Sequence, residues 1–334
     1  MKKININIRK NWLVYLIGVL FLIFIIRFRL EIIDILFTVK TGLYRWMLLA
    51  FLLQFATYYF FALTYQASLY VVDIHRKIKE LIPLVLSVMV INITTPTAGL
   101  GSTLLFSRDA QKRKESPIKA AAAVLLIMGV ESIGFSSFLI FSILYLSLNG
   151  TLGTTELIST LMFIALNILL LFLFTIALTE SSLLLQILTW VEGLINRFRR
   201  HKVHGWAKNL NTELREMAKS IIKKPKQVAR AILFQVLANT ASIASLYLLF
   251  AAFSQYPKFG IVVSGYAITY LFKIISPSPE GIGIAEGAMV IIYTSFGIPI
   301  LEASAIALTF RLINFWIPLG LGFFFFNKHN YSVK

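Results

Sequence analysis

Charged side chains inside strongly apolar segments are the residues of this 334-residue chain that are best placed to do chemistry. Glu280 and Glu286 lie in the stretch 276–287 (SPSPEGIGIAEG), between two apolar segments, and Arg311 lies inside the last apolar segment. A charge at the centre of a bilayer costs at least about 2.5–3.5 kcal/mol, so such a residue faces the protein interior and finds a partner there. We therefore expect a polar site buried among the apolar segments.

Arg311 has two interpretations, which one residue can combine. Its guanidinium carries a fork of donors that matches the oxygens of a lipid phosphate, so it would bind an anionic headgroup. Alternatively, it forms a structural ion pair with Glu286 or Glu131 that holds the helices together. Glu280 is the third acid available to it.

The glycines of the stretch 276–287 indicate how a ligand would be held. Gly281 and Gly283 follow Pro279 and lie just before the point where a helix would restart, near Glu286. A carboxylate in the first turn of a helix is stabilised by the helix dipole, which is the structural interpretation of Glu286. The functional interpretation is that Glu286 accepts a proton or a headgroup amine. Exposed amides at such a helix start also attract anions.

The composition defines the surroundings of this site. The chain is 58% hydrophobic with a mean hydropathy of +0.79, and several apolar runs exceed the roughly 18–20 residues that cross a bilayer. We therefore predict an all-α polytopic membrane protein, with about seven to eight transmembrane helices plus one or two re-entrant or broken helices. The net charge of +17 lies mainly in loops between spans, which indicates contact with anionic lipid rather than nucleic acid.

The sequence carries no motif for catalysis or for cofactor binding. There is no cysteine, and the four histidines lie in loops or in the tail. Gly281-Ile-Gly283 lacks the preceding strand that a dinucleotide-binding loop needs. We therefore expect no catalytic residue, no metal and no cofactor.

The distribution of basic residues predicts the orientation. Lysines and arginines at positions 2, 3, 9 and 10 place the N-terminus in the cytoplasm, so we expect a multi-pass protein of the cytoplasmic (inner) membrane. The predicted spans are 12–26, 46–71, 120–148, 157–178, 231–253, 259–275 and 303–326.

Two long apolar segments are interrupted by proline and glycine. The segment 81–106 contains TTPTAGLGST and has basic residues at both ends, which predicts a re-entrant hairpin on the cytoplasmic side. Arg108, directly after it, would orient the loop or capture lipid headgroups. The segment 276–297 either crosses the membrane or re-enters. Crossing would place the C-terminal tail in the cytoplasm, and re-entry would leave it outside.

The two interrupted segments are similar to each other. Placing Gly99 on Gly281 aligns TTPTAGLG with SPSPEGIG, each with a hydroxyl residue and proline followed by Gly-aliphatic-Gly. About thirty residues beyond each break, a charge (Glu131 or Arg311) lies in the next apolar segment. Weak internal repeats around broken helices are typical of transporters, and chance is the alternative. The first break adds these candidates to the site: Pro96, Gly99 and Gly101.

A basic segment divides the chain, which we interpret as a single membrane domain. The N-terminal helices occupy 1–190, a cytoplasmic loop occupies 191–230, and the C-terminal helices occupy 231–334. Within the most basic part, 197–230, apolar residues at steps of three and four from Trp206 to Ile221 form one helical stripe. Such a helix either lies on the anionic inner leaflet or packs on the spans as a linker.

Three motifs in the last sixty residues resemble those of a known family. They are PEGIGIAEG at 279–287, FGIP at 296–299 and FRLINFWIPLG at 310–320. The family is the lysylphosphatidylglycerol synthase transmembrane family, also called flippase-like domain proteins. Its members also have a proline and glycine break, a basic loop and an acid where this chain has 96–101, Arg108 and Glu131. Glu280 stands where the family more often has glycine.

The resemblance implies a membrane domain that translocates aminoacylated phospholipid. In longer members, a fused cytoplasmic acyltransferase domain makes that lipid. No such domain follows the last predicted span before Lys334, so we expect the translocating half without the synthetic half. Stand-alone members are associated with polyprenyl-linked sugars or other lipids.

These observations lead to three hypotheses. The first is the flipping of an amphiphilic lipid across the cytoplasmic membrane, with its headgroup at Arg311 and the broken helices. That lipid would be an anionic or aminoacylated phospholipid, or a polyprenyl-phosphate-linked molecule. The second is lipid modification of the phosphatidylglycerol aminoacyltransferase type. The third is a non-transporting partner that recruits a separate lipid synthase through 197–230. The expected partners are therefore membrane lipid, the anionic inner leaflet at 197–230, and a synthase or a second copy of this chain.

Overall fold

The computed structural model describes residues 37, 39–94, 101–150, 152–179, 182–198, 205–276 and 278–328. These residues form helices with no strand among them, as predicted. The helices are α3 (Tyr44–Val71), α4 (Ile78–Thr94), α5 (Gly101–Lys112), α6 (Pro117–Leu148), α7 (Thr154–Leu178), α8 (Ser182–Phe198), α9 (Trp206–Lys223), α10 (Pro225–Ala252), α11 (Phe259–Ile275), α12 (Ile284–Ser295), α13 (Ile300–Arg311) and α14 (Ile317–Lys328). The predicted first span at 12–26 lies outside the described residues.

Within the described part of the chain, five helices are long and apolar enough to cross a membrane. They are Tyr44–Val71, Pro117–Leu148, Glu156–Leu178, Pro225–Ala252 and Ile300–Lys328. The last of them joins α13 and α14 through one π-helical turn, η3 (Leu312–Trp316). Shorter apolar helices, which include α11 and α12, accompany these spans. The prediction of an all-α polytopic membrane protein is thus confirmed.

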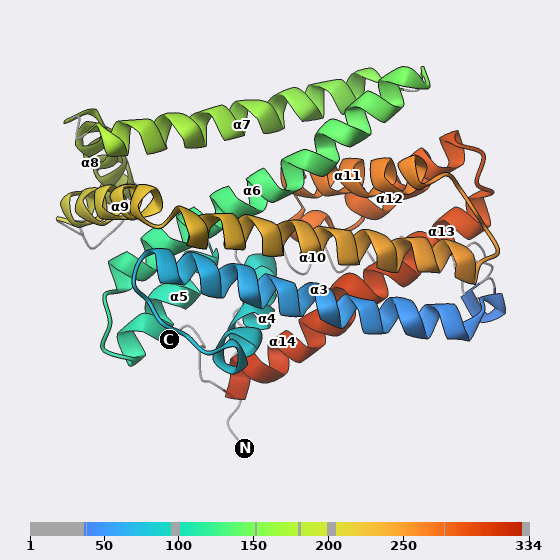
Figure 1. Ribbon diagram of the computed structural model, residues 1–334, viewed down its shortest axis with the longest axis horizontal. Coiled ribbons are helices and arrows are strands. Elements are labelled where there is room, and N and C mark those ends of the chain that lie inside the picture. The colour runs from blue at the N-terminus through green and yellow to red at the C-terminus, as the bar shows by residue number, and fades with distance from the viewer. Residues whose placement is uncertain are drawn as a thin grey trace.

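Helices α3 and α10 lie side by side and run in opposite directions (Figure 1). Many of their buried residues are Ala, Ser and Thr, which let two membrane helices approach closely. At one end of the pair, the Leu43 amide donates to the Ala252 carbonyl at 2.8 Å. At the other end, the Lys224 ammonium donates to the Tyr70 carbonyl at 3.1 Å.

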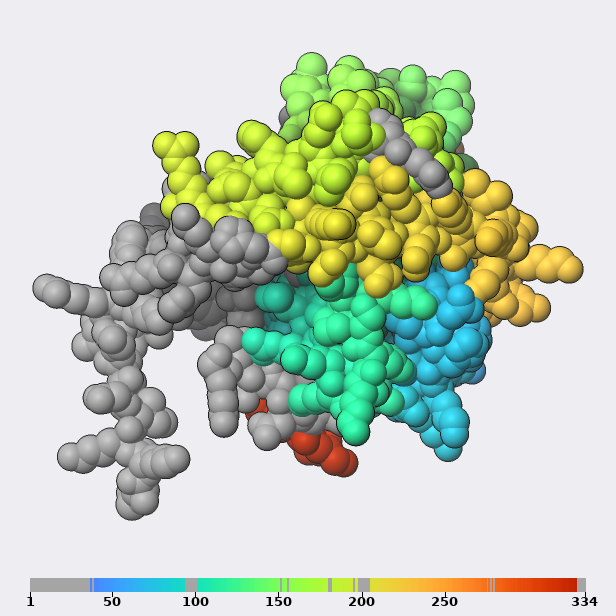
Figure 2. Space-filling model, turned by 90° about the vertical axis from the view of Figure 1, so that its left-hand side faces the viewer, coloured from blue at the N-terminus to red at the C-terminus, as the bar shows by residue number. Residues whose placement is uncertain are grey.

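These two contacts define two ends of the molecule. We call the end that contains 72–77, 113–116 and the α8–α9 pair the basic end, because most loop lysines and arginines lie there. The other end, with 149–153, 253–258 and 296–299, is called the opposite end. Figure 2 shows the basic end face on, where α9 lies across the start of α6.

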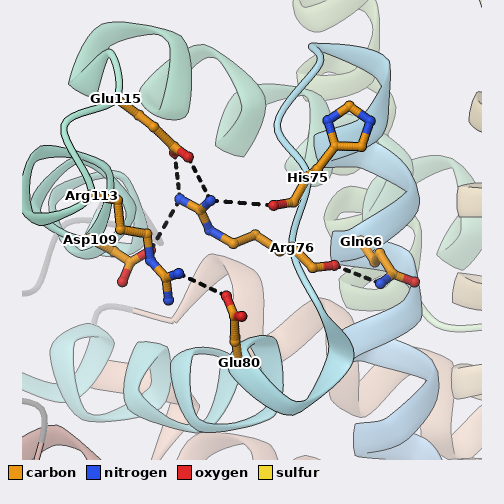
Figure 3. A network of polar contacts seen from close by, with 7 residues as sticks. All are labelled: Gln66, His75, Arg76, Glu80, Asp109, Arg113 and Glu115. Atoms are coloured by element: carbon orange, nitrogen blue, oxygen red, sulfur yellow. Dashed lines mark hydrogen bonds and ion pairs between the residues drawn. The ribbon is translucent and has the colours of Figure 1, made fainter.

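The first interrupted segment forms a hairpin of α4 and α5. Arg113, directly after α5, makes an ion pair of 2.8 Å with Glu80 in the first turn of α4 (Figure 3). Both ends of the hairpin therefore lie together, at the basic end, as expected for a re-entrant segment. Part of the break itself, 95–100, lies outside the described residues.

The second interrupted segment also forms a hairpin, and this decides the question that the sequence left open. Tyr293, in the last turn of α12, is fully buried, and its hydroxyl donates to the Val262 carbonyl in α11 at 3.5 Å. Its ring lies in the space beside Gly265. The chain thus enters through α11, turns at η2 (Pro279–Gly281), and returns through α12 to the opposite end.

One expectation about this hairpin was wrong. The sequence predicts 259–275 as a complete span. Re-entry of 276–297 after a complete span would leave the C-terminal tail on the side away from the basic loops. In the structure, α11 is itself the first half of the hairpin, because Tyr293 at the end of α12 packs beside the start of α11. The span Ile300–Lys328 then runs from the opposite end to the basic end.

The two hairpins belong to an inverted internal repeat. One unit consists of α3, the α4–α5 hairpin and α6, and the other consists of α10, the α11–α12 hairpin and the span Ile300–Lys328. Corresponding elements run in opposite directions. Each hairpin also packs against the other unit: α4 of the first unit lies against α14 of the second, and α11 of the second lies against α6 of the first. The topology is therefore that of an inverted repeat. The alignment of Gly99 with Gly281 stays a prediction, because Gly99 lies outside the described residues.

Helices α7, α8 and α9 lie beside the two repeat units. The apolar stripe of α9 packs onto neighbouring helices: Met217 and Ile221 contact a buried cluster of α3, α6 and α10 residues, and Leu214 contacts a cluster of α7 and α8 residues. Of the two interpretations of this helix, packing on the spans accounts for its apolar face. Helix α8 had no counterpart in the sequence analysis.

Candidate functional site

A polar cavity of about 180 Å³ lies where the tips of the two hairpins meet. It is halfway along the spans: Tyr58 is near the midpoint of α3, Glu131 near that of α6, and Asn314 near that of the last span. The remaining lining residues come from α3, α4, α10, α11, η2, α12, α13 and η3. They are Phe61, Tyr65, Val85, Val88, Met89, Asn92, Ser242, Tyr266, Thr269, Tyr270, Lys273, Glu280, Ala285, Phe310, Arg311 and Phe315.

Glu280 joins the two hairpin tips. One of its carboxylate oxygens accepts a hydrogen bond of 3.0 Å from the Asn92 amide in the last turn of α4. The other makes an ion pair of 2.6 Å with the Lys273 ammonium near the end of α11. Glu280 has a φ of 53°, in the left-handed region that favours glycine. This backbone accounts for the glycine that the resembling family more often has here, and the two polar contacts offset the strain.

Arg311 ties the second hairpin to the last span. Its Nε lies 2.5 Å from a Glu286 oxygen, and its Nη2 donates to the Glu280 carbonyl at 3.1 Å. The guanidinium also lies 4.3 Å from the centre of the Phe315 ring, within cation–π distance. The Arg311 side chain is only 6% exposed. Arginine has five N–H donors, and these two bonds use two of them.

Glu286 has a second partner that explains its position. Its other oxygen accepts the Gly283 amide at 2.7 Å, which closes the first turn of α12. The structural interpretation of Glu286, a carboxylate at a helix start, therefore holds together with the ion pair to Arg311. Gly281 and Gly283 have φ values of 70° and 84°. A Cβ on Gly281 would collide with the Lys273 backbone, so glycine allows the tip to approach α11 closely.

Tyrosines form much of the remaining wall. Tyr58 donates to the Asn314 carbonyl at 2.6 Å, and Tyr65 lines the cavity together with Glu131. The Lys273 ammonium lies 5.6 Å from the centre of the Tyr270 ring. Hydroxyls on aromatic rings give a wall that offers both hydrogen bonds and apolar contact, which suits a molecule with a polar and an apolar part.

Lys273, Arg311, Glu131 and Glu280 line the cavity, and Glu286 lies beside it as the partner of Arg311. Each cation has a carboxylate of its own, Lys273 with Glu280 and Arg311 with Glu286. Glu131 is the third acid, and the charge of Lys273 acts on it across the cavity. The site can therefore present donors to a phosphate on one side and a carboxylate to an amine on the other.

The structure brings some of the predicted site residues together and separates others. Arg311, Glu286 and Glu131 lie around the cavity or at its edge, with Pro279, Gly281 and Gly283 in the adjoining turn. Arg108 lies within α5 and does not line the cavity, and Gly101 is buried at the start of α5. Pro96 and Gly99 lie outside the described residues.

Sequence reasoning missed Lys273, Asn92 and the tyrosines. The predicted full span at 259–275 would place Lys273 near its end, at the membrane interface. Since α11 ends at the hairpin tip instead, Lys273 lies in the interior and pairs with Glu280. The short length of α11, 17 residues, was the available signal, because a span needs about 20.

Comparison with known proteins agrees with this architecture. The sequence pattern of the family described as the lysylphosphatidylglycerol synthase TM region matches residues 11–322. The chain is 25% identical over 327 residues to a UPF0104 membrane protein of Methanocaldococcus jannaschii, covering 96% of this chain and 95% of the relative. It is 22% identical over 281 residues to a UPF0104 membrane protein of Methanothermobacter thermautotrophicus, covering 83% of each.

Proposed function

The chain belongs to the lysylphosphatidylglycerol synthase transmembrane family, and from this membership we propose that it moves an amphiphilic lipid between the leaflets of the cytoplasmic membrane. The observation that carries the proposal is the charged cavity halfway along the spans. Ionisable residues at such a depth are costly and mark substrate pathways. A lipid headgroup that changes leaflets must pass this depth, and the cavity offers it polar partners there.

The charges indicate the kind of headgroup. Arg311 has donors beyond those used by its protein partners, so it takes the phosphate. Glu131 has no cation of its own in the way that Glu280 and Glu286 do, so it takes an amine. A zwitterionic or aminoacylated phospholipid carries both groups, and a purely anionic lipid would use only the first.

The inverted repeat supports a way of moving that headgroup. Inverted repeats with broken helices at mid-membrane are a recurrent transporter architecture, in which one repeat rocks against the other around a fixed site. Here the hairpins enter from opposite ends, and Glu280 and Asn92 form a hydrogen bond between the second hairpin's tip and the last turn of α4. Opening at one hairpin would connect the cavity to one leaflet, and opening at the other would connect it to the second.

Lipid exchange in reconstituted vesicles tests the proposal. The protein is incorporated into vesicles of phosphatidylethanolamine and phosphatidylglycerol, each with a trace of anionic, zwitterionic or lysylated phospholipid that carries a fluorophore on one chain. We expect the labelled lipid to reach the outer leaflet faster than in protein-free vesicles, with the largest effect for headgroups that carry an amine. Rates equal to those of empty vesicles for every lipid would overturn the proposal.

A double variant separates binding from structure at Arg311. Replacing one partner of a buried pair leaves a bare charge and destabilises the fold, whereas replacing both is often tolerated. The variant Arg311→Gln/Glu286→Gln should therefore fold and lose exchange. The matched control is Lys79→Gln, an exposed lysine at the basic end, which should exchange normally. Normal exchange by the double variant would show that the pair is only structural.

A further inference from the structure

A second hollow adjoins the polar cavity and differs from it in chemistry. It is a groove of about 430 Å³ between α3, α4 and the last span. Its walls are almost entirely aliphatic and aromatic side chains. They are Phe51, Phe55, Tyr59, Ile82, Leu86, Ile313, Ile317, Pro318, Leu321 and Phe325, together with Gln54 and Tyr58.

Tyr58 connects the groove to the polar cavity, because this one residue lines both. Its hydroxyl is held on the Asn314 carbonyl, at the edge of the polar cavity. A charged cavity and an apolar groove thus meet at the midpoint of α3. This is the arrangement that an amphiphile needs, with a polar headgroup on one side of Tyr58 and an apolar part on the other.

Gln54 is the second observation that points to a ligand. It lies one helical turn before Tyr58, is 2% exposed, and lines the groove. Neither the nitrogen nor the oxygen of its side-chain amide has a hydrogen-bond partner among the described residues. A buried amide without a partner costs free energy, so an unpaired one in an apolar wall is best explained by a missing polar group.

The surroundings of the groove decide what fills it. All three of its walls belong to membrane-embedded elements, and residues at its rim such as Phe55 and Tyr59 are about half exposed. At that depth the solvent is lipid hydrocarbon. A hydrocarbon chain can enter the groove from the side while the attached headgroup enters the cavity.

We propose that the groove holds one hydrocarbon chain of the transported lipid, and that the Gln54 amide hydrogen-bonds to the oxygen that links this chain to the headgroup. The inference rests on the proposed function and specifies its substrate class: a lipid with an ester or ether oxygen close to its charged group. The headgroup occupies the polar cavity at the same time, with Tyr58 between the two parts.

Filling the groove tests this directly. Ile82→Trp adds bulk at a half-buried wall position, and its control, Ile168→Trp, adds the same bulk on the membrane-facing surface of α7, where Ile168 is 61% exposed. We expect Ile82→Trp to slow exchange by about tenfold, as when the apolar contact of a few methylenes is lost. Ile168→Trp should exchange at the wild-type rate. If wild type exchanges lipid and Ile82→Trp matches it, the groove proposal fails while the proposed function stands. No exchange by wild type refutes both.

The variant Gln54→Leu distinguishes a ligand-binding role of Gln54 from a structural one, because the two roles predict opposite results for stability and exchange. Removing an unpaired buried amide should leave the melting temperature unchanged or higher, yet exchange should fall about fivefold through loss of one hydrogen bond. A lower melting temperature with normal exchange would overturn the role of Gln54.

A photoreactive amino acid at position 82 completes the test: it should label lipid in these vesicles, and labelling of residues 1–36 or of a second copy instead would overturn the proposal.

Discussion

The two hairpins share a topology but carry their charges at opposite places. The α4–α5 hairpin has its charges at the base. Arg76 donates through both terminal nitrogens to Glu115, at 2.7 and 2.5 Å, and lies 3.6 Å from Asp109 (Figure 3). Arg113 makes two ion pairs, one with Asp109 at 3.1 Å and one with Glu80 at 2.8 Å. Five side chains thus fasten the two ends of this hairpin to the loop that precedes it.

The α11–α12 hairpin has the reverse arrangement. Its base is held by a tyrosine ring, with Tyr293 packed beside Gly265 and bonded to the Val262 carbonyl. Lys273, Glu280 and Glu286 lie at or next to its tip, halfway along the spans.

This difference separates structural from functional charge in one molecule. At the base of the first hairpin, the ion pairs lie at an end of the molecule and serve as a fastener. They range from buried, as for Arg76 and Asp109, to partly exposed, as for Arg113 and Glu80. At the tip of the second, each charge costs several kcal/mol of desolvation, and apolar packing would hold the hairpin as well. Under the proposed function, the charges at this tip serve to bind a ligand. Variants at the base of either hairpin should therefore change stability, and variants at the tip should change exchange.

The largest effect on stability is expected from Arg76→Ala. The variant leaves the Asp109 carboxylate, whose side chain is 9% exposed, without one of its two arginines, and leaves Glu115 without its bidentate partner. Breaking a buried pair on one side costs about 3–5 kcal/mol. The free energy of unfolding in detergent should fall by that amount, while exchange per folded molecule should stay normal.

Lys79→Ala is the control for Arg76→Ala, because Lys79 is exposed at the same end of the molecule. Surface changes of this kind are usually within about 0.5 kcal/mol. If Arg76→Ala and Lys79→Ala had equal free energies of unfolding, the ion pairs at the base of the α4–α5 hairpin would not stabilise it. The contrast between the two hairpins would then be wrong.

Two glycines test the apolar base of the second hairpin. A Cβ at Gly265 would collide with the Tyr293 ring, so Gly265→Ala should cost about 1–3 kcal/mol through overpacking. Gly287 lies in the same hairpin, within α12, with nothing within 4 Å of such a Cβ. Gly287→Ala should therefore stabilise the protein by up to about 1 kcal/mol through helix propensity. The measurement is thermal unfolding of both variants in detergent. Gly265→Ala at least as stable as wild type would show that the Tyr293 contact does not fix this base.

The same contrast shows what the sequence could predict. The breaks, the re-entry of 81–106 and the burial of Arg311 beside Glu286 follow from local signals, because proline, glycine and charge in an apolar segment are visible in a short window. The direction of 276–297 and the place of Lys273 depend on which segment packs beside α11. That is decided by contacts such as Tyr293 with Gly265, 28 residues apart in the chain, and the periodicity of the sequence does not reveal such contacts. Asn92 was missed for the same reason, since its partner Glu280 lies 188 residues away.

The smallest expected effect is the pH dependence of the stability that the base of the α4–α5 hairpin contributes. The hydrogen bonds from Arg76 hold the pKa of Glu115 below its ordinary value of 4.5. A lowered carboxyl pKa contributes stability that is present above the unfolded value and is lost as the pH falls through the folded value. Glu115 is about one-third exposed, so solvent screening keeps the contribution below about 1 kcal/mol. Unfolding measured from pH 7 down to 3 should show a steeper loss below about pH 4.5 for wild type than for Glu115→Gln. Equal slopes would mean that Arg76 stabilises the base of the α4–α5 hairpin through its ion pair with Asp109 alone, and that its bonds to Glu115 contribute nothing.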